Sequence, residues 1–151
     1  MYRKILLGID DSEDAVRAAK KAIELQKNYG SEVVAFHSVL HHFSEINPSL
    51  ISISGGGSNI ALTIHEDYIK KGEKILKDLN ELYNQSDAKV ETRLVYDIPP
   101  EDYIKKTVKK ENFDLVILGC KGHHSKITRS IVGTVPLKVM NDTNSDVLIV
   151  R

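Results

Sequence analysis

The chain has 151 residues, with 21 Lys and Arg against 21 Asp and Glu, so its formal net charge at pH 7 is zero. This length suits one domain, residues 1–151, with a sizeable core. The balanced charge gives no net field that would attract nucleic acid or an anionic membrane surface. The first apolar run stops at Ile9, which is too short for a signal peptide or a membrane span. A single cysteine, Cys120, forms no internal disulfide, and we expect a cytoplasmic protein.

Two kinds of sequence pattern alternate along the chain. Five short segments are mostly apolar and rich in β-branched residues, and such runs are typical of parallel strands covered on both faces. They predict strands at residues 5–9, 33–39, 90–95, 113–118 and 147–150. Alternation with helices predicts an α/β fold, a doubly wound three-layer sandwich whose five-stranded parallel sheet has the strand order 3-2-1-4-5.

Helical periodicity fills the intervals between these strands. Ser12 is placed to cap a first helix over residues 12–29. Its apolar face consists of Ala15, Ala18, Ala19, Ala22 and Ile23. A second apolar stripe spans residues 68–83 and a third spans 103–108. Thr134 is predicted to cap a fourth helix that ends near Asn141.

The segment after the fourth strand has the composition of a phosphate-binding turn. Gly119-Cys120-Lys121-Gly122 follows that strand, and Gly133-Thr134-Val135-Pro136 comes after a polar loop. Glycine permits positive φ and close approach of the backbone to a ligand, and a helix start offers unpaired N–H groups to an anion. Ligands of doubly wound sheets bind beyond the carboxyl ends of the strands. We therefore expect this turn to meet residues 10–12, after the first strand, in a nucleotide site.

The same residues have structural interpretations that the sequence leaves open. Gly119 and Gly122 are compatible with an ordinary strand-to-helix turn, and Thr134 with a helix cap. The aspartates at positions 10 and 11 are also suited to capping the first helix. Lys121 is suited both to a phosphate and to solvent.

Three further features lie outside this turn. Residues 41–64 are polar and rich in glycine, and we expect a flexible loop that is a lid, a partner surface or an insertion. Adjacent side chains on an extended segment point in opposite directions, so the pair His123 and His124 does not have the spacing of a zinc site. We assign both histidines to the loop near the phosphates. Lysine pairs such as Lys70 and Lys71 are assigned to solvated helix faces.

Over nearly its whole length the chain resembles universal stress proteins of the ATP-binding type. The resemblance is carried by residues 5–13, 35–39, 113–122, 133–135 and 146–150. The loop between Gly122 and Gly133 is one residue longer than the usual spacing of the family. Asp11 stands where the family usually has a small residue. This second carboxylate disfavours ATP near it unless a divalent cation is bound.

The resemblance implies a site for ATP, with ADP or AMP as alternatives, in which glycine backbone holds the phosphates and a backbone group of the second strand contacts adenine. It also implies Asp10 as a candidate ligand of nucleotide-bound Mg²⁺. The predicted nucleotide-binding set is Gly8, Asp10, Ser38, Gly119, Lys121, Gly122, His123, His124, Ser125, Gly133, Thr134 and Val135. The family forms homodimers, commonly through the last strand, here residues 147–151.

Several functions are compatible with these features. We favour a nucleotide-binding regulatory module of the stress response. A slow ATPase is an alternative, although no base or water-positioning residue is evident and no catalytic residue is assigned. A family member that has lost nucleotide binding and acts through dimerisation is a further alternative. A phosphoacceptor receiver domain is disfavoured, because Arg151 leaves no room for a fifth helix after the last strand.

Overall fold

The structure is a computed structural model that describes residues 1–40, 57–121 and 132–151, without the side chains of residues 57–64. Its strands start and end within two residues of the predicted positions. They are β1 (Lys4–Gly8), β2 (Glu32–Val39), β3 (Glu91–Tyr96), β4 (Leu115–Gly119) and β5 (Asp146–Val150). The helices are α1 (Glu13–Tyr29), α3 (Gly57–Gln85), α4 (Pro100–Glu111) and α5 (Thr134–Asp142).

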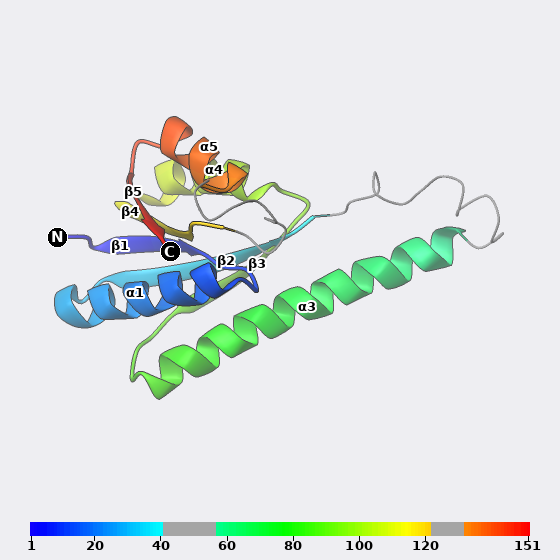
Figure 1. Cartoon of the computed structure of the whole chain (residues 1–151), viewed down its shortest axis with the longest axis horizontal. Helices are drawn as coiled ribbons and strands as arrows, with labels where there is room; N and C mark the ends of the chain where they lie inside the picture. Colours follow the sequence, from blue (N-terminus) through cyan, green and yellow to red (C-terminus); the bar gives the residue numbers. More distant parts are fainter. Residues whose placement is uncertain (41–56, 122–131) are drawn as a thin grey trace.

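The five strands form one sheet in the order β3-β2-β1-β4-β5, and each neighbouring pair is parallel. Helices α1 and α3 cover one face of this sheet, and α4 and α5 cover the other (Figure 1). The predicted α/β sandwich and its strand order are therefore confirmed. Each helical crossover carries the chain from the carboxyl end of one strand back to the amino end of the next. The carboxyl ends of all five strands therefore lie on the same side of the sheet.

Alternation along the strands divides the core between the two faces. Ile5 and Leu7 of β1 pack with the alanine face of α1 and with α3. Leu6, between them, packs on the opposite face against α4 and α5, together with Phe36 and Ile104. The predicted apolar face of α1 is buried, and its alanines let this helix lie close to the sheet.

Local signals fix the ends of α1. The Ser12 Oγ accepts a hydrogen bond from the backbone N–H of Ala15 at 3.1 Å, as an N-cap residue does. At the other end Gly30 adopts the left-handed conformation, with φ of 71°, and its N–H donates to the Gln26 carbonyl. The predicted cap and length of this helix are confirmed.

The predicted loop over residues 41–64 is wrong in its last part, because α3 begins at Gly57. The sequence predicts this helix only from Tyr68, where its apolar stripe begins. Once a helix is anchored by packing, each further residue adds a hydrogen bond at little cost, so it extends beyond the stripe. Residues 41–56 of the predicted loop lie outside the described residues. Within the described residues, no helix is long and apolar enough to cross a membrane.

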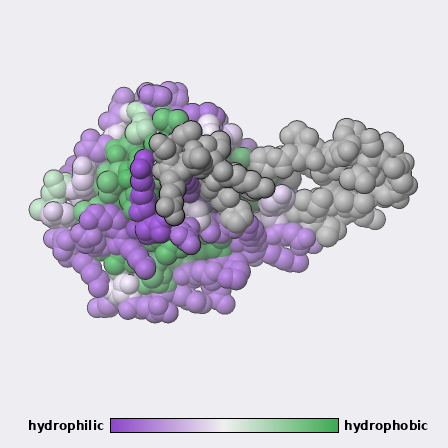
Figure 2. All heavy atoms as spheres, in the orientation of Figure 1, coloured by the Kyte–Doolittle hydropathy of each residue, from purple (hydrophilic) through white to green (hydrophobic). Residues whose placement is uncertain are grey.

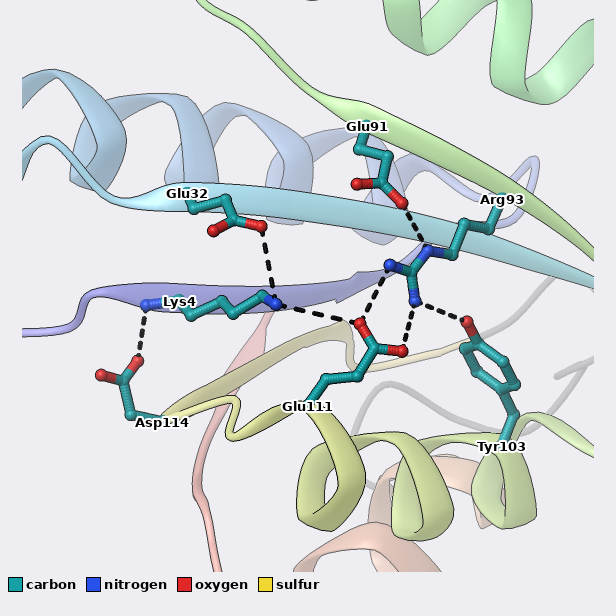
Figure 3. Close-up of polar contacts among 7 residues, drawn as sticks. All are labelled: Lys4, Glu32, Glu91, Arg93, Tyr103, Glu111 and Asp114. Atoms are coloured by element: carbon teal, nitrogen blue, oxygen red, sulfur yellow. Dashed lines mark hydrogen bonds and ion pairs between the residues drawn. The ribbon is translucent and has the colours of Figure 1, made fainter.

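A cluster of charged side chains ties β3 to the end of α4 near the amino ends of the strands (Figure 3). The Arg93 guanidinium donates two hydrogen bonds to the Glu111 carboxylate, at 2.8 and 3.0 Å, and also bonds Glu91. The Lys4 ammonium lies 3.8 Å from the same Glu111 carboxylate. The Arg93 hydrogen bonds lower the pKa of Glu111 although partial burial opposes this shift, and the charges of Lys4 and Lys110 contribute in the same direction.

Candidate functional site

The carboxyl edge of the sheet brings together the two loops that the sequence singles out. β1 pairs with β2 on one side and with β4 on the other, so the direction of strand addition reverses between β1 and β4. Open α/β sheets bind ligands in the crevice at such a point. The N–H of Gly133 donates to the Cys120 carbonyl at 2.8 Å, which holds the start of α5 against the turn after β4.

The loop after β1 is organised around the start of α1. The Asp10 Oδ1 accepts a hydrogen bond from the backbone N–H of Ser12 at 2.9 Å. This contact fits the structural interpretation of Asp10, since the carboxylate fixes the loop that precedes the helix. It uses one of the two carboxylate oxygens. A role of Asp10 beside a nucleotide or its Mg²⁺ stays a prediction.

Gly119 lies at the contact between β4 and α1. A Cβ at this position would lie 2.8 Å from the Ala15 backbone nitrogen and 2.9 Å from the Asp14 carbonyl carbon. Gly119 and Gly133 do not use the positive φ that glycine permits, because Gly30 is the one described glycine with positive φ. Gly119 is required by packing against backbone.

Asp14 reaches from α1 to the turn after β4, and sequence reasoning did not include it in the site. Its Oδ2 accepts a hydrogen bond from the Lys121 backbone N–H at 3.1 Å, and its carboxylate pairs with the Arg17 guanidinium. A carboxylate therefore occupies one backbone donor of the predicted phosphate turn. The sequence carries no signal for this contact, because an aspartate in the first turn of a helix is common for reasons of capping and dipole.

The start of α5 differs from the prediction by one residue. Gly133 is the N-cap and Thr134 is the first helical residue, so the predicted threonine cap is wrong. Gly133 has φ of −62° and ψ of 161°, and among the described residues no side chain caps this end. The N–H groups in the first turn of a helix have no partner within the helix, so those of Thr134 and Val135 are suited to an anionic acceptor.

The end of β2 is tied to two neighbouring segments. The Ser38 hydroxyl donates to the Ile98 carbonyl, beyond the end of β3. The His37 Nδ1 lies 2.8 Å from the Ile9 carbonyl oxygen, and because a carbonyl only accepts, Nδ1 carries the proton. His37 is absent from the predicted set. The sequence signal that could have identified His37 is its polar side chain within an otherwise apolar strand.

Gly8, at the end of β1, has a packing role of its own. A Cβ there would lie 2.5 Å from Leu118 Cδ2 and 3.6 Å from the ring of Phe36. The position faces the same layer as α4 and α5, and the neighbouring side chains fill the space that a side chain would need. Packing alone therefore explains why position 8 is a glycine, and its role in the nucleotide pocket stays a prediction.

Asp11 is paired across the molecule with helix α3. The Lys71 Nζ lies 2.6 Å from Asp11 Oδ2, and the two side chains are 50% and 28% exposed. The sequence predicts Asp11 to disfavour ATP without a divalent cation and Lys71 to lie on a solvated helix face. The 50% exposure of Lys71 agrees with the second prediction, and the first stays a prediction. Residues so distant in sequence are brought together only by the packing of α3 on the sheet.

The remaining predicted residues, Gly122, His123, His124 and Ser125, lie outside the described residues. Among the residues that the structure does describe, no group of three or more His, Cys, Asp or Glu side chains gathers as in a metal centre. The described part of the site therefore offers backbone N–H groups and single carboxylates. This donor set suits a phosphate group and a cation shared with it.

A comparison with models of known families matches residues 1–151 to the universal stress protein family. The chain belongs to this family. A universal stress protein of Methanocaldococcus jannaschii is 25% identical over 152 residues, which cover 100% of this chain and 83% of that relative. The match extends over the whole of the candidate site and its supporting elements.

Solved structures of universal stress proteins share the fold. UspA of Lactobacillus plantarum superposes with a TM-score of 0.80 at 20% identity, covering 99% of this chain and 98% of that one. The universal stress protein of Archaeoglobus fulgidus in complex with dAMP has a TM-score of 0.69 at 18% identity and covers 99% and 98% of the two chains. At these identities the likeness establishes the shared sheet order and layers.

Proposed function

We propose that this universal stress protein is a cytoplasmic regulatory module that binds an adenine nucleotide, ATP first and ADP or AMP as alternatives. The observation that carries the proposal is the helix start without a side-chain cap at Gly133, held 2.8 Å from the Cys120 carbonyl at the switch point of the sheet. The complex of the Archaeoglobus fulgidus relative with dAMP supports an adenine nucleotide as the ligand.

In this proposal each part of the nucleotide has its own contact. The N–H groups at the start of α5 and the turn that begins at Gly119 receive the phosphates, and the backbone near Ser38 receives the adenine. Asp10 would help to hold a Mg²⁺ ion bound with the nucleotide, and few protein ligands would be needed because Mg²⁺ keeps several waters. The bound metal neutralises phosphate charge. No described side chain is assigned as a general base, so the protein acts by binding.

The proposal includes a homodimer through the last strand. β5 is an edge strand, and residues 147–150 are all apolar and half-buried. Figure 2 shows hydrophobic surface at the level of the sheet between hydrophilic surfaces over α5 and α1, where β5 lies in Figure 1. An apolar edge with unpaired backbone groups suits pairing with another strand.

Ligand analysis of purified protein tests the proposed nucleotide site. Protein prepared without added nucleotide is denatured and the released ligand identified by mass spectrometry. The emptied protein is then titrated with ATP, ADP and AMP, with and without Mg²⁺. We expect adenine nucleotide in the extract or saturable binding in the titration. A protein that binds none of the three contradicts the proposal and favours a member that acts through dimerisation alone.

The substitution Gly133→Val tests the site itself. A side chain at the start of α5 blocks close approach of a phosphate. The φ of −62° at Gly133 suits any residue, and a Cβ there, 3.1 Å from the Cys120 carbonyl oxygen, requires only a small shift. We expect nucleotide affinity to fall at least tenfold, equivalent to about 1.4 kcal/mol, while circular dichroism stays unchanged. Leu137→Ala, at an exposed position of the same helix, is the control. Retained affinity in the folded Gly133→Val protein argues against phosphate binding at this helix start.

A further inference from the structure

Three carboxylates lie close in sequence at the loop after β1, which ends at the edge of the sheet where the phosphates are proposed to bind. Asp10, Asp11 and Asp14 lie within five residues of the chain, between the end of β1 and the first turn of α1. An anionic ligand there meets repulsion unless each carboxylate is compensated. The way in which the protein compensates these three carboxylates therefore affects how many negative charges a bound nucleotide can carry.

The compensation of two of these carboxylates is local. Asp10 accepts the Ser12 N–H, and Asp14 pairs with Arg17 one helical turn away. Asp11 differs, because the cation that pairs with it comes from another element. Lys71 of α3 places its ammonium 2.6 Å from the Asp11 carboxylate.

The seating of α3 against the sheet sets the position of Lys71. Gly72, the next residue, is buried, and a Cβ there would lie 2.8 Å from Leu94 Cδ1 and 3.0 Å from His37 Cδ2. Glycine at this position lets the helix approach β2 and β3 closely. His37 in turn bonds the Ile9 carbonyl, two residues before Asp11. The backbone of α3 at Gly72 is thus packed against the strand that carries His37, and the adjacent Lys71 lies within reach of the loop after β1.

We propose that Lys71 is a specificity-determining residue of the nucleotide site, which allows a nucleoside polyphosphate to bind by compensating the charge of Asp11. This inference rests on the proposed nucleotide-binding function. Loss of the Lys71 ammonium increases the repulsion between the Asp11 carboxylate and the ligand, in proportion to the charge of the ligand. At neutral pH ATP carries about two more negative charges than AMP, so ATP is the more strongly affected of the two. As both side chains are partly exposed, solvent screens the effect, and it is largest at low salt.

Nucleotide titrations of four variants test the proposal, with ATP and AMP in low-salt buffer containing EDTA. In Lys71→Met we expect ATP affinity to fall about fivefold and AMP affinity to change less than about twofold. The double variant Lys71→Met with Asp11→Asn restores the ratio of ATP to AMP affinity, and Asp11→Asn alone favours ATP. Lys74→Met removes a lysine that pairs with Asp78 on the same helix and is the control, expected to behave as the wild type.

The outcomes separate this inference from the proposed function. Equal losses for ATP and AMP in Lys71→Met, or no restoration by Asp11→Asn, mean that Lys71 only supports the fold, and overturn the inference while the nucleotide site stands. An unchanged Lys71→Met protein overturns it in the same way. A wild-type protein that binds neither nucleotide in EDTA, and still binds neither when Mg²⁺ replaces the EDTA, overturns both proposals. Thermal unfolding of each variant verifies that α3 remains folded.

Discussion

At the scale of single residues, Tyr83 stands out because its hydroxyl is buried without a partner. The side chain is 1% exposed, and the structure gives its hydroxyl no hydrogen bond among the described residues. Burial raises the pKa of this phenol, which keeps it neutral at physiological pH. A neutral but unpaired hydroxyl has lost its water without gaining a protein partner, which costs stability.

Replacing Tyr83 with Phe removes this cost while keeping the ring. We expect Tyr83→Phe to leave the free energy of unfolding unchanged or to raise it by up to about 1 kcal/mol in urea titrations. Tyr29→Phe, at a position that is 47% exposed, is the matched control and should have no effect. A loss of more than about 1 kcal/mol would mean that a buried water satisfies the Tyr83 hydroxyl.

At the scale of elements, the packing of α1 on β4 depends on Gly119. A Cβ at Gly119 meets the backbone of α1 at 2.8 Å, and backbone cannot turn aside as a side chain can. We expect Gly119→Ala to lower the free energy of unfolding by about 2 kcal/mol, because α1 must shift away from the sheet. Gly133→Ala, whose Cβ would lie 3.1 Å from the Cys120 carbonyl oxygen, is the comparison and should cost less. Equal stabilities in urea unfolding would contradict the packing role of Gly119.

The charged cluster between β3 and α4 makes a second element-scale prediction, on pH dependence. The folded-state pKa of Glu111 lies below its ordinary value of 4.5. Its contribution to stability is therefore present above pH 4.5 and is lost as pH falls through the folded-state pKa. We expect Glu111→Gln to cost about 1–2 kcal/mol at pH 7, because a charge-assisted bidentate bond is replaced by a neutral one, and to cost little at pH 2.

Chemical unfolding at pH 7 and pH 2 measures this difference. Glu24→Gln, which alters an exposed pair with Lys21 on α1, is the control and should change stability by less than about 0.5 kcal/mol at either pH. If the cost of Glu111→Gln is the same at both pH values, the substitution acts through packing and the carboxylate charge has no part in it.

At the scale of the whole molecule, the open question is how the edge strand β5 is covered. We expect twice the mass of the chain in sedimentation equilibrium, because β5 presents an apolar edge to solvent. Val150→Lys places a charge at the end of this strand and should shift the equilibrium toward the monomer. Val16→Lys adds the same charge at an exposed position of α1 and should leave the mass unchanged. A monomeric wild-type protein contradicts the predicted homodimer.

The sequence by itself determined the layers, the strand order and the boundaries of most elements. Near-continuous apolar strands, the alanine face of α1 and the Ser12 cap are local patterns, and each acts through neighbours in the chain or through simple periodicity. The loops that meet at the switch point followed from topology, because parallel strands end at one edge.

Only the tertiary structure decided what individual residues of the site do. Gly119 is packed against α1, Asp14 accepts the Lys121 N–H, and Lys71 forms an ion pair with Asp11. Each of these contacts joins residues that are far apart in the chain, and their distance depends on how closely a helix packs on the sheet. Periodicity predicts which face of a helix is buried, but not which side chain at its edge reaches a loop on another element.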